Sequence, residues 1–265
     1  MLRLVLIALP LGGCVMPAQR VDAIAAAAGF SRALVHGVGY DHVVYSNDRP
    51  VGTSLHVYIE GDGRAYLDRW TAAPDPTPRR ALMLELMKSD PVRAIYVGRP
   101  CYFGLATVAP CTPLDWTLRR FSEPVVDSMA SAVATAAAGA PSIEIYGHSG
   151  GGTFAVLLAG RLPNVTRIVT LAGNLDPVAW NRLHGYTAFT DLVDPLAQGP
   201  LPARMSQVHA VGENDRNVPP GIVEAAARKL GAADVRVVPD ADHACCWERL
   251  WPALRDGVVS ASDGV

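Results

Sequence analysis

Apolar residues along this chain follow two alternating periodicities. Short runs rich in Val and Ile, bounded by Gly, Pro, Asn or Asp, predict strands, and stretches with apolar residues three or four positions apart predict helices. The predicted strands span residues 41–46, 53–60, 94–98, 142–146, 166–171, 208–212 and 235–238. The predicted helices span residues 79–88, 123–138, 152–162, 220–230 and 247–255. The first two strands surround a turn at residues 47–52, and the later alternation of helix and strand predicts an α/β fold, a mostly parallel sheet with helices on both faces.

One long irregular stretch, residues 174–204, separates two of the predicted strands. Connections of this length are uncommon in compact domains and are usually functional. We therefore expect a small cap excursion over a site, with Trp180, Tyr186 and Phe189 as its apolar lining. The same aromatic side chains would equally fasten the excursion to the core, and the sequence leaves both interpretations open. The Pro-rich residues 74–78 predict a surface turn rather than a linker.

Composition and charge narrow the classes of partner. Hydrophobic residues make up 50% of the chain and charged residues 18%, which indicates a sizeable buried core. The formal net charge is −2, and the sequence contains no basic run, no Cys/His cluster with metal spacing and no phosphate-binding loop. We therefore expect no nucleic-acid partner, no metal and no cofactor, and we expect a small-molecule substrate.

The segment Gly147-His148-Ser149-Gly150-Gly151 lies between a predicted strand and a predicted helix. A sharp strand-to-helix turn holds its serine in a strained conformation, and the glycines remove Cβ atoms that would collide where strand and helix approach. A G-x-S-x-G string alone occurs by accident in about one chain of this length in ten, so the strand-turn-helix context carries the interpretation. This context predicts Ser149 as an exposed nucleophile.

A nucleophilic serine needs a neighbouring base that a carboxylate orients. Asp215 directly follows the predicted strand at 208–212, and His243 directly follows the one at 235–238. Because the carboxyl ends of parallel strands share one edge of a sheet, these two side chains and Ser149 can converge there. We predict His243 as the general base and Asp215 as the carboxylate that orients it.

Other polar residues near these positions offer alternative interpretations. Asp176 or Asp194 could supply the carboxylate in place of Asp215. His148, at the variable position of the turn, is expected to pack rather than react. Asp240 and Asp242 are expected to shape the loop that carries the predicted base.

The first residues resemble a bacterial lipoprotein signal. Arg3 precedes an apolar stretch at residues 4–11, too short to span a bilayer, and residues 11–14 read Leu-Gly-Gly-Cys. The resemblance implies a signal peptide at residues 1–13, cleavage before Cys14 and a lipid on that cysteine, with an ordinary signal peptide cut near Ala18 as the alternative. We expect a tether at residues 14–29 and one domain at 30–265. Val15 after the cysteine implies the periplasmic face of the outer membrane, with the membrane as a partner through the lipid.

Four cysteines remain once Cys14 is set aside, and export to an oxidising compartment allows three pairings. Cys101 and Cys111 flank a loop that contains Pro and Gly, and we predict a disulfide between them. Cys245 and Cys246 are adjacent, and Cα atoms about 3.8 Å apart lie below the usual range for a disulfide, so their pairing stays open. Free buried thiols are the alternative for both pairs.

Further motifs extend the pattern around the predicted nucleophile: IEGDG at residues 59–63, RPCY at 99–102 and HACCW at 243–247. With them, residues 53–255 resemble the α/β-hydrolase superfamily and, within it, a group of bacterial α/β-hydrolase lipoproteins. The resemblance implies an oxyanion hole made of the Gly150 amide and a second amide that matches Asp62, with Gly63 as the alternative. This chain has Glu60 where the superfamily pattern has histidine. Tyr102 would line the pocket or belong to the core.

These residues together predict a serine hydrolase that cleaves a carboxylic ester through an acyl-enzyme. A serine peptidase or amidase on the same fold is the alternative enzyme, because a fold does not fix its substrate. A lipoprotein that binds a ligand in the cell envelope without catalysis is the alternative outside enzymes.

Overall fold

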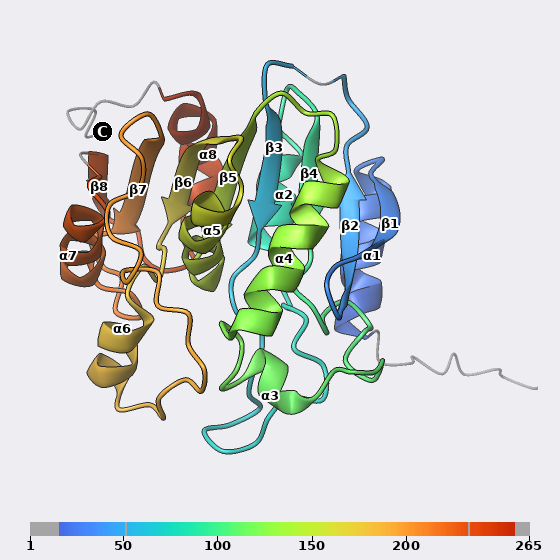
Figure 1. The fold of residues 1–265 in the computed structure, drawn as a ribbon, viewed down its shortest axis with the longest axis horizontal. Helices are drawn as coiled ribbons and strands as arrows, with labels where there is room; N and C mark the ends of the chain where they lie inside the picture. Colours follow the sequence, from blue (N-terminus) through green and yellow to red (C-terminus); the bar gives the residue numbers. More distant parts are fainter. Residues whose placement is uncertain (1–15, 51, 233, 258–265) are drawn as a thin grey trace, which may run out of the picture.

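A single sheet organises the molecule, which is described here by a computed structural model of residues 16–50, 52–232 and 234–257 (Figure 1). The predicted signal segment 1–13 and Cys14 lie outside the described residues. The sheet has eight strands in the order β1-β2-β4-β3-β5-β6-β7-β8. β1 and β2 run antiparallel to their neighbours, and the pairs from β4 to β8 are parallel. The strands are β1 (Ser31–His36), β2 (Asp41–Ser46), β3 (Leu55–Ile59), β4 (Ala94–Val97), β5 (Ile143–His148), β6 (Val165–Leu171), β7 (Ser206–Gly212) and β8 (Asp234–Val238).

Helices cover both faces of this sheet, as the alternation in the sequence predicts. Buried side chains of α4, α5 and α7 pack on one face, and those of α1, α2 and α8 pack on the other. The helices are α1 (Pro17–Ala27), α2 (Leu82–Met87), α3 (Pro113–Trp116), α4 (Glu123–Ala136), α5 (Gly150–Arg161), α6 (Pro177–His184), α7 (Pro220–Lys229) and α8 (Trp247–Asp256). No helix in the described part of the chain is both long enough and apolar enough to cross a bilayer.

The two faces of the sheet have cores of different character. Successive strand residues point to opposite faces, so Val57 and Ile59 join the aliphatic core under α4 and α5, whereas Tyr58 joins an aromatic core under α8. The Tyr58 hydroxyl donates to Asp90 at 2.7 Å and accepts from the indole N–H of Trp251 at 3.3 Å. The buried hydroxyl therefore has both a donor and an acceptor partner. An unpaired buried hydroxyl would cost about 1 to 3 kcal/mol of folding free energy.

The strand order at the antiparallel edge of the sheet differs from the order that the sequence predicts. The predicted strands at 41–46 and 53–60 are present as β2 and β3, but they do not pair with each other, because β4 lies between them. The connection through α2 places β4 parallel to β3, and β2 then pairs with the free edge of β4. β1 was not predicted, because its residues are almost all solvent-exposed and show no apolar alternation.

The expected tether at residues 14–29 is largely a helix in the structure. α1 begins at Pro17, and its Val21 and Ala25, each 1% exposed, pack into the aromatic core. The carboxylate of Asp22 accepts from the Tyr45 hydroxyl at 2.7 Å and from Arg32 at 2.9 Å. These contacts fix the segment to the domain, so the expectation of a free tether is wrong for residues 17–27.

Two pairs of cysteines lie at disulfide-bonding distance in the described structure. Cys101 and Cys111, the predicted pair, have Cα atoms 5.5 Å apart and close a loop across ten positions. Cys245 and Cys246, whose pairing the sequence left open, are also bonded to each other and lie just before α8.

Candidate active site

Ser149 occupies the sharp turn between β5 and α5. Its backbone has φ 51° and ψ −119°, outside the conformations that L-residues favour. A Cβ added at Gly147 would come within 2.2 Å of the Gly151 carbonyl oxygen, and one at Gly151 within 2.2 Å of the Ile59 carbonyl oxygen. The Ser149 amide donates to the Leu171 carbonyl at 3.0 Å and so ties the strained turn to β6.

Ser149, His243 and Asp215 form a hydrogen-bonded chain. Nε2 of His243 lies 3.1 Å from Oγ of Ser149, and Nδ1 of His243 lies 2.8 Å from Oδ2 of Asp215. The Asp215 side chain is fully buried, and its Oδ1 accepts the amides of Asn217 and Val218, both at 2.8 Å. The carboxylate is thus fixed by two N–H groups and leaves one oxygen for the imidazole, which holds His243 with Nε2 toward the serine.

The alternative carboxylates are engaged elsewhere. Asp176 caps the N-terminus of α6 by accepting the Ala179 amide at 2.8 Å. Asp194 accepts the Leu196 amide at 2.9 Å. Asp242 shapes the loop after β8, because it accepts the amides of Ala244 and Cys245 at 2.8 and 2.7 Å.

The carboxylate of Asp62 lies between two arginines, next to the turn that contains Ser149. Nη1 of Arg99 and Nη1 of Arg120 each lie 2.5 Å from one of its oxygens. Burial alone would raise the pKa of Asp62, but the two guanidinium groups outweigh it and lower that pKa to about 2. Arg99 is itself 2% exposed and stacks over the rings of Phe154 and Phe121 at 4.8 and 5.3 Å.

Gly150 and Asp62, whose amides the sequence resemblance assigns to the oxyanion hole, lie beside each other next to the serine, since a Cβ built on Gly150 would come within 2.1 Å of Oδ1 of Asp62. Neither amide donates a hydrogen bond to any of the described residues. The Asp62 carbonyl accepts from the buried hydroxyl of Tyr102 at 2.9 Å, and this contact makes Tyr102 a core residue that supports the loop rather than a wall of the pocket.

Glu60 and His148 connect the serine turn to the neighbouring loops. The Glu60 carboxylate accepts the amides of Gly61 at 3.2 Å and Met83 at 3.0 Å. Nδ1 of His148 lies 3.7 Å from the same carboxylate, and its Nε2 lies 2.9 Å from the carbonyl oxygen of His243. His148 therefore links the IEGDG loop to the loop that carries the imidazole.

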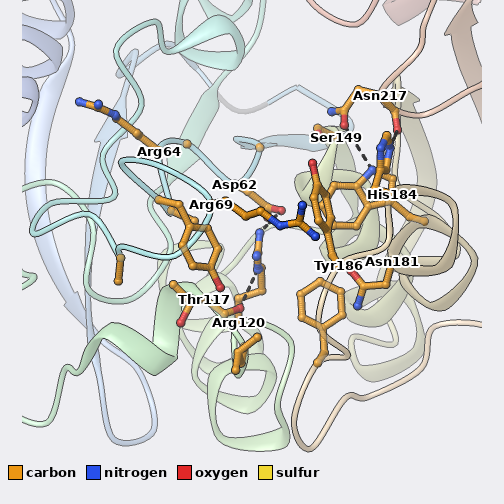
Figure 2. A pocket seen from close by; sticks show the side chains of 18 of the residues that line it. Asp62, Arg64, Arg69, Thr117, Arg120, Ser149, Asn181, His184, Tyr186 and Asn217 are labelled. Carbon is orange, nitrogen blue, oxygen red and sulfur yellow. Dashed lines mark hydrogen bonds and ion pairs between the residues drawn. The ribbon is translucent and has the colours of Figure 1, made fainter.

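An open cleft of about 1370 Å³ leads to Ser149 and His243. One wall is the loop of residues 60–80, and the other is the excursion after β6, with α6 at its start (Figure 2). Trp180 and Phe189 stack with their rings parallel, 6.4 Å apart, and Tyr186 lies beside them. Both sequence interpretations hold, since the three aromatics line the cleft while Trp180 and Phe189 also pack on the aliphatic core.

Asn217 fixes the excursion to the loop that carries Asp215. Its side-chain oxygen accepts from the Trp180 indole at 3.3 Å, and its backbone oxygen lies 2.7 Å from Nε2 of His184 (Figure 2). The backbone N–H of Asn217 also donates a hydrogen bond to Asp215. The same residue therefore holds both the aromatic side chains of the excursion and the Asp215 carboxylate. Among the described residues, no His, Cys, Asp and Glu side chains are grouped in a way that would hold a metal ion.

Similar architecture occurs in solved structures. The chain is similar to Est1E from Butyrivibrio proteoclasticus with ferulic acid bound, at a TM-score of 0.61 and 14% identity, over 85% of this chain and 97% of that chain. It is similar to a hyperthermophilic esterase from the archaeon Pyrobaculum calidifontis at a TM-score of 0.58 and 13% identity, over 92% of each chain. The chain has the α/β-hydrolase fold.

A further match to this α/β-hydrolase fold is an α/β serine hydrolase without a lid from Xanthomonas campestris, with a TM-score of 0.55 and 14% identity over 86% of this chain and 93% of that chain. No protein-family model and no curated protein sequence matches the chain. The predicted α/β-hydrolase fold class is confirmed by the sheet order and by these likenesses.

Two residues beside the site, Arg99 and Arg120, have no role that the sequence predicts. Arg99 begins the RPCY motif, whose pattern does not indicate an ion pair, and Arg120 lies shortly before α4 with no local sequence signal.

Proposed function

We propose that this protein is a serine hydrolase that cleaves a carboxylic ester. The hydrogen-bonded chain from Ser149 through His243 to Asp215, at the floor of an open cleft, is the observation that carries the proposal. The choice of an ester over an amide follows the solved esterases that share this fold, and because the fold itself does not fix the substrate, it needs the substrate comparison below.

The reaction begins when Oγ of Ser149 attacks the ester carbonyl and its proton passes to Nε2 of His243. The carbonyl oxygen becomes an oxyanion, which the amides of Gly150 and Asp62 would stabilise, since both lack an acceptor among the described residues. The imidazolium forms 2.8 Å from the Asp215 carboxylate, which stabilises its charge.

The tetrahedral intermediate collapses when His243 donates its proton to the leaving alkoxide, which departs as the alcohol and leaves the acyl group on Ser149. A water molecule then loses a proton to the same imidazole and attacks the acyl-enzyme. Collapse of the second intermediate returns the proton to Oγ and releases the carboxylic acid.

Ser149→Ala tests the proposal. We expect the wild-type protein to hydrolyse 4-nitrophenyl esters and to be labelled by a fluorophosphonate, and we expect the variant to do neither while keeping its circular dichroism spectrum and melting temperature. Labelling of the variant at the wild-type rate would remove Ser149 from the mechanism. Faster turnover of aminoacyl 4-nitroanilides than of matched esters would favour a peptidase, and an unreactive wild-type protein would favour a binding role.

We also propose that Cys14 carries a lipid and holds the domain on a membrane of the cell envelope. The Leu-Gly-Gly-Cys segment supports this proposal. Cells fed an alkyne-tagged fatty acid should yield labelled wild-type protein in the membrane fraction. Cys14→Ser should abolish the label and release the protein, and a labelled Cys14→Ser variant would contradict the proposal.

A further inference from the structure

Arginines gather around the cleft although the whole chain has a net charge of −2. Five arginines and no lysine line it: Arg64, Arg69, Arg79, Arg80 and Arg120. Arg120 is paired with Asp62, and Arg80 is paired with Glu248 outside the cleft. The other three form no ion pair with any of the described residues.

The cleft is also lined by three acidic residues, none of which forms an ion pair with Arg64, Arg69 or Arg79. The oxygens of Glu60 accept backbone amides of Gly61 and Met83. Asp68 accepts the amides of Trp70 and Thr71 at 2.8 and 2.9 Å. Asp62 is shared between Arg99 and Arg120. All three carboxylates keep their negative charge, so the lining carries five arginines against three acidic residues and has an excess of two positive charges.

Arg69 is the arginine that reaches into the cleft. Figure 2 shows its side chain extending from the loop on one side toward Tyr186 on the other, whereas Arg64 points away from the serine. The Arg69 guanidinium also lies 5.1 Å from the ring centre of Trp70, which is 81% exposed at the rim. A planar guanidinium fork facing an aromatic wall suits a ligand with an apolar body and a carboxylate.

We propose that the substrate is an anionic ester, with a carboxylate that Arg69 binds at a distance from the scissile carbonyl. The apolar part of the acyl chain then lies along Trp180, Tyr186 and Phe189, and the charged end points to the loop of residues 60–80. This inference rests on the proposed ester hydrolysis and extends it to a substrate class.

A pair of synthetic esters that differ only in charge tests the proposal. We would compare 4-nitrophenyl hydrogen adipate and suberate with their methyl-capped counterparts. Wild-type kcat/KM should favour the anion about tenfold for at least one chain length, and 0.5 M NaCl should reduce this preference because exposed charges are screened. Arg69→Gln should raise KM for the anionic ester alone, and Arg69→Lys should recover part of the loss.

Arg228→Gln is the matched control, because Arg228 is exposed near the end of α7 and does not line the cleft. It should leave both substrates unaffected. Equal wild-type kcat/KM for charged and capped esters at both chain lengths would overturn the inference, as would an Arg69→Gln variant that keeps the preference.

Calorimetry on the Ser149→Ala variant separates this inference from the proposed reaction. Tighter binding of the anionic ester, lost on adding Arg69→Gln, supports charge recognition even if the wild-type protein turns over no ester. Equal binding of the two esters overturns the inference while leaving ester hydrolysis by Ser149 intact.

Discussion

The carboxylate of Asp62 lies directly against the Cα atom of Gly150. A β-carbon built on Gly150 would come within 2.1 Å of Oδ1 of Asp62. The carboxylate has no freedom to withdraw, because Arg99 and Arg120 hold both of its oxygens. Glycine at position 150 therefore keeps the two flanking amides close together as well as permitting the turn.

Gly150→Ala should impair catalysis more than folding. The added methyl group pushes the Asp62 loop away and displaces one proposed oxyanion donor, and losing such a donor costs about 100- to 1000-fold in kcat. Ester kinetics and the rate of fluorophosphonate labelling would measure the loss. Gly221→Ala is the control, since a Cβ at this position in α7 meets nothing within 4 Å, and it should leave kcat unchanged.

Asp62→Asn should destabilise the protein at neutral pH by about 3 kcal/mol, because it leaves two arginines beside the turn without their counter-charge. The folded pKa of about 2 is below the ordinary value of 3.8, so the carboxylate stabilises the fold fully above about pH 4 and loses this contribution as the pH falls toward 2. The difference in unfolding free energy between wild type and variant should shrink by about 2 kcal/mol over that range. Urea unfolding of both proteins at pH 7, 4 and 2.5 measures this difference in unfolding free energy. A difference that does not change with pH would contradict the lowered pKa of Asp62.

Asp215→Asn should lower kcat by about four orders of magnitude with little change in KM. The amide can present its N–H₂ group to Nδ1 of His243, and the imidazole then no longer turns a free Nε2 lone pair toward the serine. Asp176→Asn, which alters the cap of α6 and the ion pair with Lys229 at 3.9 Å, should retain wild-type kcat. Comparable losses in the two variants would mean that Asp215 has no special role.

His42 and His209 should remain neutral well below their ordinary pKa. Burial lowers the pKa of each from 6.5 to about 4, and both ring nitrogens of His42 have partners, the Gly98 carbonyl at 2.9 Å and the Ser128 hydroxyl at 2.8 Å. The unfolded chain takes up protons first, so the free energy of unfolding should fall by about 3 kcal/mol per histidine between pH 6.5 and 4. Imidazole NMR signals at pH 5.5, assigned with His42→Gln and His209→Gln, should show neutral rings, and imidazolium signals from either would refute the prediction.

The pattern of apolar and turn residues predicted those elements of the fold that depend on neighbouring residues in the sequence. The strand at residues 41–46 has the same bounds in the structure, because buried apolar residues run through it between turn residues. The order of Ser149, Asp215 and His243 after three parallel strands was enough to predict that they converge, since the sheet brings those strand ends to one edge.

Features that depend on distant partners were beyond the sequence. The position of β4 between β2 and β3 depends on pairing across about 50 residues, which no turn signal reports. The cluster of Asp62, Arg99 and Arg120 joins three separate segments, each of which reads as ordinary loop or helix entry. α1 lay in a stretch read as a tail, although Val21 and Ala25, four positions apart, already show helical spacing.

The position of α1 has a consequence for how a lipidated molecule would stand on a membrane. Only Val15 and Met16 separate Cys14 from Pro17, where the packed helix begins. Even fully extended, this connection spans about 10 Å. A lipid at Cys14 would therefore keep the domain pressed close to the headgroups with little freedom to swing outward. Such an enzyme would draw its substrates from molecules at or near the bilayer surface rather than from the full width of the surrounding compartment.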